Sequence, residues 1–87
     1  MKVANWERFA DELRAALIKR YPTITWRATA ERRAEVAGVN VEARRLGTGA
    51  AAQFWVDSGT IQAMKLHDLL ETIHTEVERQ LAAQRNT

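Results

Sequence analysis

The stretch from Val39 to Asp57, VNVEARRLGTGAAAQFWVD, decides the fold of this chain. Apolar and polar residues alternate on both sides of the segment Gly47–Gly49, as they do along half-buried β-strands. Glycine adopts positive φ angles without steric cost, so this segment predicts a tight turn between two strands. The alternation places apolar side chains on one face of the hairpin and mostly polar ones on the other. The first set is Val39, Val41, Ala43, Ala52, Phe54 and Val56, and the second is Arg44, Gln53 and Trp55.

The segments before and after this hairpin carry their own patterns. Apolar residues in Trp6–Tyr21 recur along one stripe at helical spacing, and Asn5 is placed to act as the N-cap. The segment Thr23–Ala30 alternates strictly and predicts a first strand. Leucine, isoleucine and valine recur on one face after Ser58-Gly59-Thr60, which predicts a second helix from residue 60 to about residue 85.

The segment Glu31–Gly38 allows two interpretations. One is a short helix, with Thr29 as its N-cap and Gly38 just past its end. The other is a turn at Glu31–Arg33 and a strand from Ala34, with a bulge at Gly38 that restores the phase of the alternation. The strand is favoured, because a helix of barely two turns has little apolar surface to hold it in place.

The predicted order is α-β-β-β-α. The fold class is α+β, a three-stranded antiparallel sheet with two helices packed on one face. Eighty-seven residues provide one core, so residues 1–87 are expected to form a single domain whose tail frays from about residue 84. The order resembles that of double-stranded-RNA-binding domains. Those domains begin their last helix with lysines, whereas SGTIQAMKLHDLLE has Lys65 as its sole cation, so membership is not predicted.

The expected length of the second helix predicts self-association. At about 1.5 Å per residue this helix would measure ~37 Å, whereas a compact chain of this size has a diameter nearer ~30 Å. Its last two turns would then extend past the sheet and expose apolar side chains. We therefore expect a homodimer through this helix, with Val77, Leu81 and His74 as interface candidates.

The composition limits the kinds of function. The formal net charge of +2 is too small to require a polyanionic partner, and the absence of cysteine excludes disulfides and thiolate catalysis. No apolar run approaches the roughly 20 residues that cross a bilayer, and the N-terminal segment turns acidic where a signal peptide turns apolar. We expect a cytoplasmic location and no membrane partner. Residues 23–50 hold five arginines against three glutamates, which makes this middle region the expected binding region.

The face of the sheet opposite the helices is the first candidate site. If Phe54 faces the helices, Trp55 must face away from them. The residues expected on its side are Arg27, Arg44 and Gln53. Tryptophan and arginine dominate the energetic centres of protein interfaces, and tryptophan also stacks on bases. In the alternative, structural interpretation, Trp55 packs on its cross-strand neighbours beneath an arginine.

Paired arginines form a second candidate site. Arg32 and Arg33 lie near one expected turn and Arg44 and Arg45 near the next, and paired guanidinium groups can contact phosphates. Neighbouring glutamates can also neutralise them as ordinary surface ion pairs, and this interpretation is favoured.

A histidine and glutamate series follows one edge of the second helix. It consists of His67, Glu71, His74 and Glu78. Imidazole and carboxylate groups bind zinc, but histidines two turns apart lie about 10 Å from each other and cannot share one ion. Gly47–Gly49 is followed by a strand where a phosphate loop needs a helix. We therefore expect no metal, no cofactor and no catalytic residue.

These patterns predict a small non-enzymatic interaction module of the adaptor, regulator or inhibitor type. It would bind a protein partner through the open sheet face, with Trp55 as an anchor and the arginines as oriented hydrogen-bond donors. The alternative is a nucleic-acid-binding domain that uses the Arg-rich sheet and turns. The predicted partner-binding residues are Trp55, Arg27, Arg44, Gln53, Arg32, Arg33 and Arg45.

Overall fold

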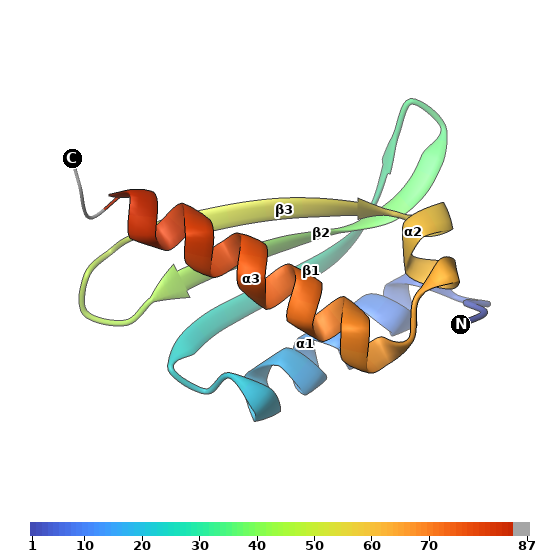
Figure 1. Ribbon diagram of the computed structural model, residues 1–87. Helices are drawn as coiled ribbons and strands as arrows, with labels where there is room; N and C mark the ends of the chain where they lie inside the picture. The colour runs from blue at the N-terminus through green and yellow to red at the C-terminus, as the bar shows by residue number, and fades with distance from the viewer. Residues whose placement is uncertain (85–87) are drawn as a thin grey trace.

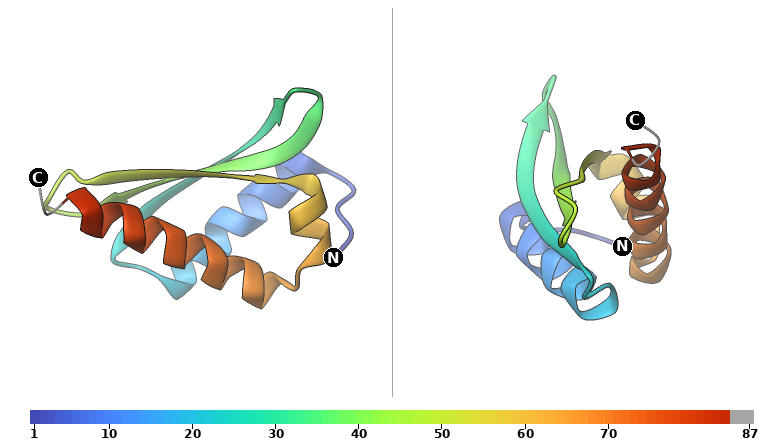
Figure 2. Two further views of the ribbon diagram at one scale, coloured as in Figure 1. Left: turned by 45° about the horizontal axis from the view of Figure 1, so that its top comes forward. Right: turned by 90° about the vertical axis from the view of Figure 1, so that its left-hand side faces the viewer.

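The computed structural model describes residues 1–84, which form one helix, three strands and two further helices (Figure 1). The elements are α1 (Trp6–Arg20), β1 (Ile24–Arg33), β2 (Val36–Arg45), β3 (Ala51–Asp57), α2 (Ser58–Ala63) and α3 (Leu66–Gln84). The strands are antiparallel and make one sheet in the order β1-β2-β3. The α1 and α3 helices lie on the same face of this sheet (Figure 2). The predicted α+β fold class is confirmed.

The first helix begins where the sequence predicts. The side-chain oxygen of Asn5 accepts a hydrogen bond from the backbone N–H of Arg8 at 3.1 Å, which confirms Asn5 as the N-cap. The helix ends at Arg20, one residue earlier than expected, because Tyr21 precedes a proline and leaves the helical conformation. Its apolar stripe buries Phe9, Ala10, Leu13 and Leu17.

The β1–β2 hairpin differs from the prediction. The two strands pair residue for residue along their whole length, so that only Ala34 and Glu35 form the turn. Both have positive φ, 50° and 66°, as the two residues of a tight hairpin turn do. The turn expected at Glu31–Arg33, the bulge at Gly38 and the alternative short helix are therefore wrong. The turn escaped prediction because neither residue is the asparagine or glycine that usually occupies such positions.

The two faces of the sheet are sorted as the alternation predicts. Buried on the helix-covered face are Ile24, Trp26, Val39, Val41, Ala43, Ala52 and Val56. The register places Phe54 opposite Val41 on this face and Trp55 opposite Asn40 on the other. Trp55 therefore faces away from the helices. The predicted β2–β3 turn is also confirmed, since Gly47 and Gly49 have φ angles of 86° and 73°.

The single helix expected after β3 is interrupted. The α2 helix has Asp57 as its N-cap and buries Ile61, and it ends at Ala63. Met64 then adopts an extended conformation, with φ −109° and ψ 157°, before α3 begins at Leu66. The sequence Ile61–Leu66 contains no glycine or proline, so no local signal predicted the break.

The break and the elongated sheet remove the reason for a dimer through this helix. The 19 residues of α3 span about 28 Å, and the ten-residue strands beneath it span about 33 Å. The molecule measures 39 × 28 × 18 Å, so the helix fits along its long axis. Val77 and Leu81 are 0% and 1% exposed within one chain, and the expected overhang is therefore wrong. The prediction failed because it assumed a spherical molecule.

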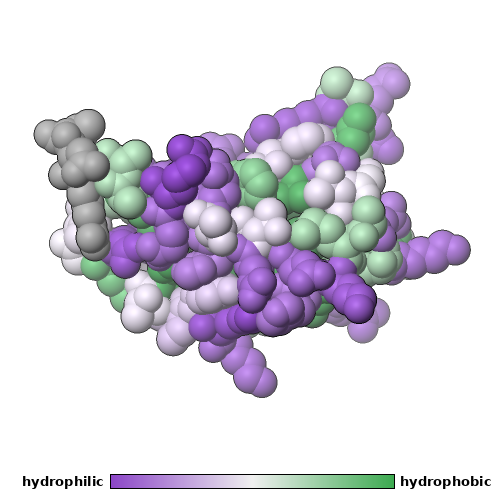
Figure 3. Space-filling model, in the orientation of Figure 1, coloured by the Kyte–Doolittle hydropathy of each residue, from purple (hydrophilic) through white to green (hydrophobic). Residues whose placement is uncertain are grey.

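The C-terminal end of α3 is held against the sheet. Gln84, where fraying was expected to start, is the last helical residue, and its side chain hydrogen-bonds the backbone of Ala51. Residues 85–87 of the predicted frayed tail lie outside the described residues. The exposed side of α3 is mainly hydrophilic (Figure 3). Within residues 1–84, no helix has both the length and the apolar character needed to cross a membrane.

Candidate functional site

The open face of the sheet, which is the face opposite the helices, carries Arg33 and four more of the predicted partner-binding residues. Trp55, Arg27, Arg44 and Gln53 all project from it, as the alternation predicts. From β1 it carries Thr25, Arg27, Thr29, Glu31 and Arg33, from β2 Val36, Gly38, Asn40, Glu42 and Arg44, and from β3 Ala51, Gln53, Trp55 and Asp57. Three arginines therefore share this face with three carboxylates, so the face is mixed in charge and not uniformly basic.

One end of the open face is filled by Trp55. The indole rests on Gly38, where an added Cβ would lie 2.8 Å from two of its ring carbons. The guanidinium of Arg33 lies 5.2 Å from the ring centroid, within the range of a cation–π contact. Trp55 is half-buried, and its Nε1 is buried without a hydrogen-bond partner among the described residues. This geometry is that of the structural interpretation, in which tryptophan packs beneath an arginine.

Asn40 lies beside Trp55 and organises the polar groups around it. Asn40 is only 5% exposed, and its side-chain oxygen accepts hydrogen bonds from Arg33 at 3.3 Å and from Gln53 at 3.0 Å. Its amide nitrogen donates to Glu42 at 3.4 Å. The sequence prediction did not include Asn40. Asparagine is disfavoured in strands, and its place in the middle of a central strand was the available signal.

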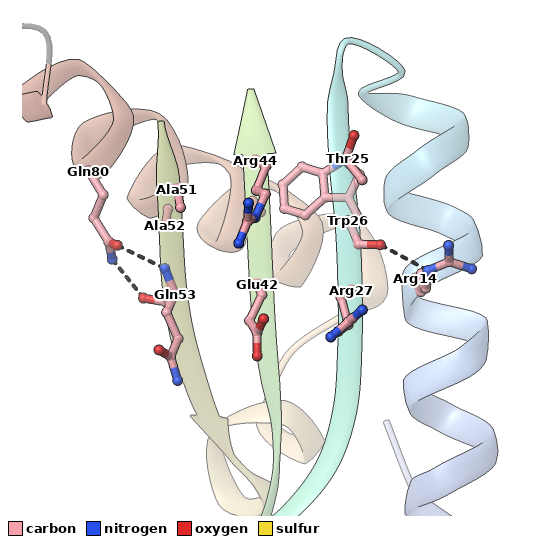
Figure 4. Close-up of a pocket in the computed structure, with 11 residues that line it drawn as sticks. Arg14, Thr25, Trp26, Arg27, Glu42, Arg44, Ala51, Ala52, Gln53 and Gln80 are labelled. Atoms are coloured by element: carbon pink, nitrogen blue, oxygen red, sulfur yellow. Dashed lines mark hydrogen bonds between the residues drawn. The ribbon is translucent and has the colours of Figure 1, made fainter. Parts of the chain in front are cut away.

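The other end of the open face is hollow. We define the arginine hollow by Arg14, Thr25, Arg27, Glu42, Arg44, Ala51, Gln53 and Gln80, which line a depression of about 670 Å³ (Figure 4). The depression forms because the open-face residues on either side of Arg44, Thr25 on β1 and Ala51 on β3, have small side chains. Arg14 of α1 and Gln80 of α3 flank the floor on its two sides, and neither was predicted from the sequence.

Arg27 and Arg44 are the side chains of the hollow that are available to bind a ligand. Both are exposed, and neither forms an ion pair or a hydrogen bond within residues 1–84. Glu42 lies directly opposite Arg27 in the register and two residues from Arg44 along β2. These two guanidinium groups and that of Arg14, which also lines the hollow, surround one carboxylate and leave a net positive charge. The hollow can therefore accept a carboxylate or another small anionic group by charge-assisted hydrogen bonds.

Side-chain amides seal the sheet edge beside the hollow. Gln80 accepts a hydrogen bond from the backbone N–H of Gln53 at 3.0 Å and donates to its carbonyl at 2.8 Å. Gln84 forms the same pair of bonds with the backbone of Ala51. The spacings match, because four helical residues and two strand residues both advance by about 6 Å. Two glutamines thus replace a neighbouring strand along this part of β3.

The two arginine pairs do not form one cluster. Arg33 and Arg44 project from the open face, whereas Arg32 and Arg45 project from the helix-covered face. Arg45 donates to both carboxylate oxygens of Glu78, at 2.7 and 2.8 Å. Arg33 and Arg44 lie near opposite ends of the sheet, about 27 Å apart along the strands. A joint phosphate contact by these four residues is therefore not supported by their placement, and Arg33 and Arg45 form surface ion pairs, as the favoured interpretation expects.

The histidine and glutamate edge of α3 is occupied by contacts within the chain. His67 Nε2 lies 3.3 Å from Glu71, and the guanidinium of Arg20 lies 2.9 Å from His67 Nδ1. His74 stacks on Tyr21 with ring centroids 3.8 Å apart. His67, Asp68 and Glu71 could place ligand atoms within 4.8 Å of one another, but the guanidinium already supplies a cation there. This exposed cluster gives no support for a metal site.

Asp57 connects the open face to α2. Its carboxylate accepts from the Thr60 hydroxyl at 2.6 Å and from the Thr60 backbone N–H at 3.0 Å. These hydrogen bonds, the hydroxyl bond first, lower the pKa of Asp57 below its ordinary value. The third carboxylate of the open face is therefore engaged as a helix cap.

Comparison of the chain with protein-family models, with curated proteins and with solved structures found no match. Among the described residues, the exposed charged groups of the open face without an ion pair or hydrogen bond include Arg27 and Arg44.

Proposed function

We propose that this chain is a small, cytoplasmic, non-enzymatic interaction module that binds a protein partner through the arginine hollow. The observation that carries the proposal is the state of Arg27 and Arg44, which are exposed and have no partner within residues 1–84. Arginine presents five donors in a planar fork that matches a carboxylate. The partner would place aspartate or glutamate side chains over the hollow, one at each guanidinium.

The other arginines of the middle region differ from these two. Arg33 donates to Glu31 at 2.9 Å and Arg45 to Glu78 at 2.7 Å, so each would have to leave a carboxylate before it bound a partner. Arg32 donates to the backbone carbonyl of Glu35 at 3.5 Å. Arg27 and Arg44 have no such bond to break, so a partner gains the full strength of the new contacts.

A protein partner fits the open face better than a nucleic acid. Glu31, Glu42 and Asp57 lie among the arginines and would repel a phosphate backbone. Trp55, the residue that could stack on a base, is already covered by Arg33. Nucleic-acid binding also depends on the neutralisation of several phosphates. The hollow has Arg27 and Arg44, together with Arg14, which is bonded to the Trp26 carbonyl, around one carboxylate. Trp55 would therefore support the face and contact a partner only at its margin.

Affinity capture with matched variants tests the proposal. The immobilised protein is exposed to an extract of its source cells, and the wild type is compared with Arg27→Ala/Arg44→Ala. Arg8→Ala/Arg79→Ala is the control, because it removes the same charge from helix surfaces outside the open face. We expect the first variant to lose a defined protein at least tenfold, since each charge-assisted contact contributes about 1.5–3 kcal/mol, and the control to retain it.

The same capture distinguishes the alternative. Recovery of the same protein by wild type and by Arg27→Ala/Arg44→Ala would contradict the proposal. Recovery that nuclease abolishes, and that falls steeply with salt concentration, would assign the hollow to nucleic acid instead.

A further inference from the structure

The two edge strands of the sheet, β1 and β3, differ in how far their outward backbone groups are hydrogen-bonded. The outward backbone groups of β3 at Ala51 and Gln53 are bonded by Gln84 and Gln80. On the opposite edge, the Ile24 N–H donates to the Tyr21 carbonyl at 3.3 Å, and the Trp26 carbonyl accepts from the Arg14 side chain at 2.9 Å. Figure 2 shows β1 on the side of the sheet away from α3, with its hairpin end standing clear of the helices.

An unpaired stretch of β1 follows from the register. Backbone groups of an antiparallel strand point alternately toward each neighbour, and the odd-numbered residues of β1 face β2. Those of Ala28, Ala30 and Arg32 therefore point outward. Within the described part of the chain, no hydrogen bond satisfies them. Free strand edges are normally blocked by lysine, proline or a bulge, and none of these occurs between Ala28 and Arg32.

We infer that this free edge pairs with the same edge of a second copy of the chain. Two copies related by a two-fold axis would join antiparallel through Ala28 and Ala30, with four backbone hydrogen bonds between them. The alanine side chains are small enough to allow this close approach. The two sheets would then form one six-stranded sheet whose open faces are continuous.

Charge selects the register of this pairing. With Thr29 on the two-fold axis, Arg27 of each copy lies opposite Glu31 of the other, which creates two ion pairs on the open face. With Ala30 on the axis, Arg27 would oppose Arg33 of the second copy. With Glu31 on the axis, the two glutamates would oppose each other. Only the first of these three registers is electrostatically favourable.

This inference goes beyond the proposed function, because it requires no other partner. Dimer formation would affect the proposed function, because Arg27 cannot contact Glu31 of a second copy and an acidic partner at the same time. Self-pairing and partner binding would therefore compete at Arg27. The contact is small, so we expect it to be weak and reversible, with dimers forming at high micromolar concentration.

Analytical ultracentrifugation of the purified chain tests the inference. The wild type should show dimers whose fraction rises with concentration. Ala30→Pro should abolish them without unfolding the protein, because the N–H that proline lacks points away from β2. Arg27→Glu and Glu31→Arg should each weaken the dimer at least tenfold, and the double variant Arg27→Glu/Glu31→Arg should restore it. Arg8→Glu serves as the control for charge alone, and circular dichroism checks the fold of each variant.

Three results would overturn the inference. The first is a wild type that stays monomeric at millimolar concentration, and the second is a dimer that persists in Ala30→Pro. The third is a double variant that dimerises no better than its two single variants. None of these results bears on the capture experiment, so the two proposals can fail separately.

Discussion

Trp26 and Trp55 lie on opposite faces of the same sheet, and their surroundings differ. Trp26 is 1% exposed, and its Nε1 donates to the carbonyl of Tyr21 at 3.1 Å. Trp55 is half-buried beneath Arg33, and its Nε1 has no partner among residues 1–84. The helices complete the surroundings of the first tryptophan, whereas only neighbouring strands and one charged side chain cover the second. Trp55 is therefore held by contacts within the sheet, and we expect the core to remain folded when these contacts are lost.

The largest expected effect is on stability and separates the two tryptophans. Trp26→Ala should lower the free energy of unfolding by about 3–5 kcal/mol, because it leaves a cavity under both helices. Trp55→Ala should lower it by about 1–2 kcal/mol, since part of the Trp55 side chain is already in contact with water. Urea denaturation followed by circular dichroism measures both.

Replacement by phenylalanine sharpens this comparison. Trp26→Phe removes the hydrogen bond from the indole to the Tyr21 carbonyl, which then keeps only its bond from the Ile24 N–H at 3.3 Å, and it leaves a small cavity in the core. The two effects together should cost about 1–3 kcal/mol. Trp55→Phe removes a buried donor that has no partner, so its effect should lie within about 0.5 kcal/mol. Equal losses in the two variants would show that the faces do not differ in the way described.

The next effect concerns the floor under Trp55. In Gly38→Ala, the new Cβ would lie 2.5 Å from the Val56 carbonyl oxygen and 2.8 Å from the indole, so backbone and ring must shift. We expect a loss of about 1–3 kcal/mol in the free energy of unfolding. Gly59→Ala is the control, because its Cβ meets only the Asp57 side chain, at 3.1 Å. If Gly38→Ala and Gly59→Ala had the same small effect, Trp55 could not be packed on Gly38.

Much of this contrast could be predicted from alternation. A period of two assigned Trp26 to the covered face and Trp55 to the open face, because a pleated strand leaves no other choice. What lies next to Trp55 could not be predicted. Its contact with Gly38 depends on β2 running without a bulge at that glycine. The place of Arg33 depends on the turn at Ala34 and Glu35, neither of which is a usual turn residue. A shift of that turn by one residue would change the position of Arg33 and remove its contact with Trp55.

The arginine hollow shows the same limit. Arg27, Arg44 and Gln53 could be placed together from the strand pattern alone. Arg14 and Gln80 could not, because the approach of two helices to the sheet edges is a tertiary contact that periodicity does not contain. The break at Met64 has the same origin, since burial of Ile61 and the path of α3 decide it rather than a local signal.

A smaller effect is expected from the cover of Trp55. Arg33→Ala should lower the free energy of unfolding by about 0.5–1 kcal/mol, through loss of the cation–π contact and of the bond to Asn40. It should also expose Trp55 and shift its fluorescence to longer wavelength, in a Trp6→Phe/Trp26→Phe background that isolates this signal. Arg32→Ala, the neighbour on the other face, is the control. An unchanged emission maximum would show that Arg33 does not cover the indole in solution.

The smallest effect is one of pH, and it arises at Asp57, where the two faces meet. This residue ends β3 on the Trp55 side, and as the N-cap of α2 it holds the helix that buries Ile61 in the core. Its pKa is lower in the folded chain because the carboxylate accepts hydrogen bonds from Thr60. The unfolded chain therefore binds the proton more tightly. The stabilisation is fully present above the ordinary carboxyl pKa of about 3.9 and is lost as pH falls through the lower, folded value.

Asp57→Asn isolates this contribution, because asparagine keeps an acceptor oxygen at the cap but cannot be protonated in this range. Urea denaturation at pH 7 and at pH 3 should show a smaller loss of stability on acidification in Asp57→Asn than in the wild type. NMR titration of the Asp57 side-chain carboxyl should give a pKa below the ordinary value. A pKa at or above the ordinary value would contradict this prediction. It would show that the hydrogen bonds from Thr60 do not stabilise the ionised carboxylate of Asp57.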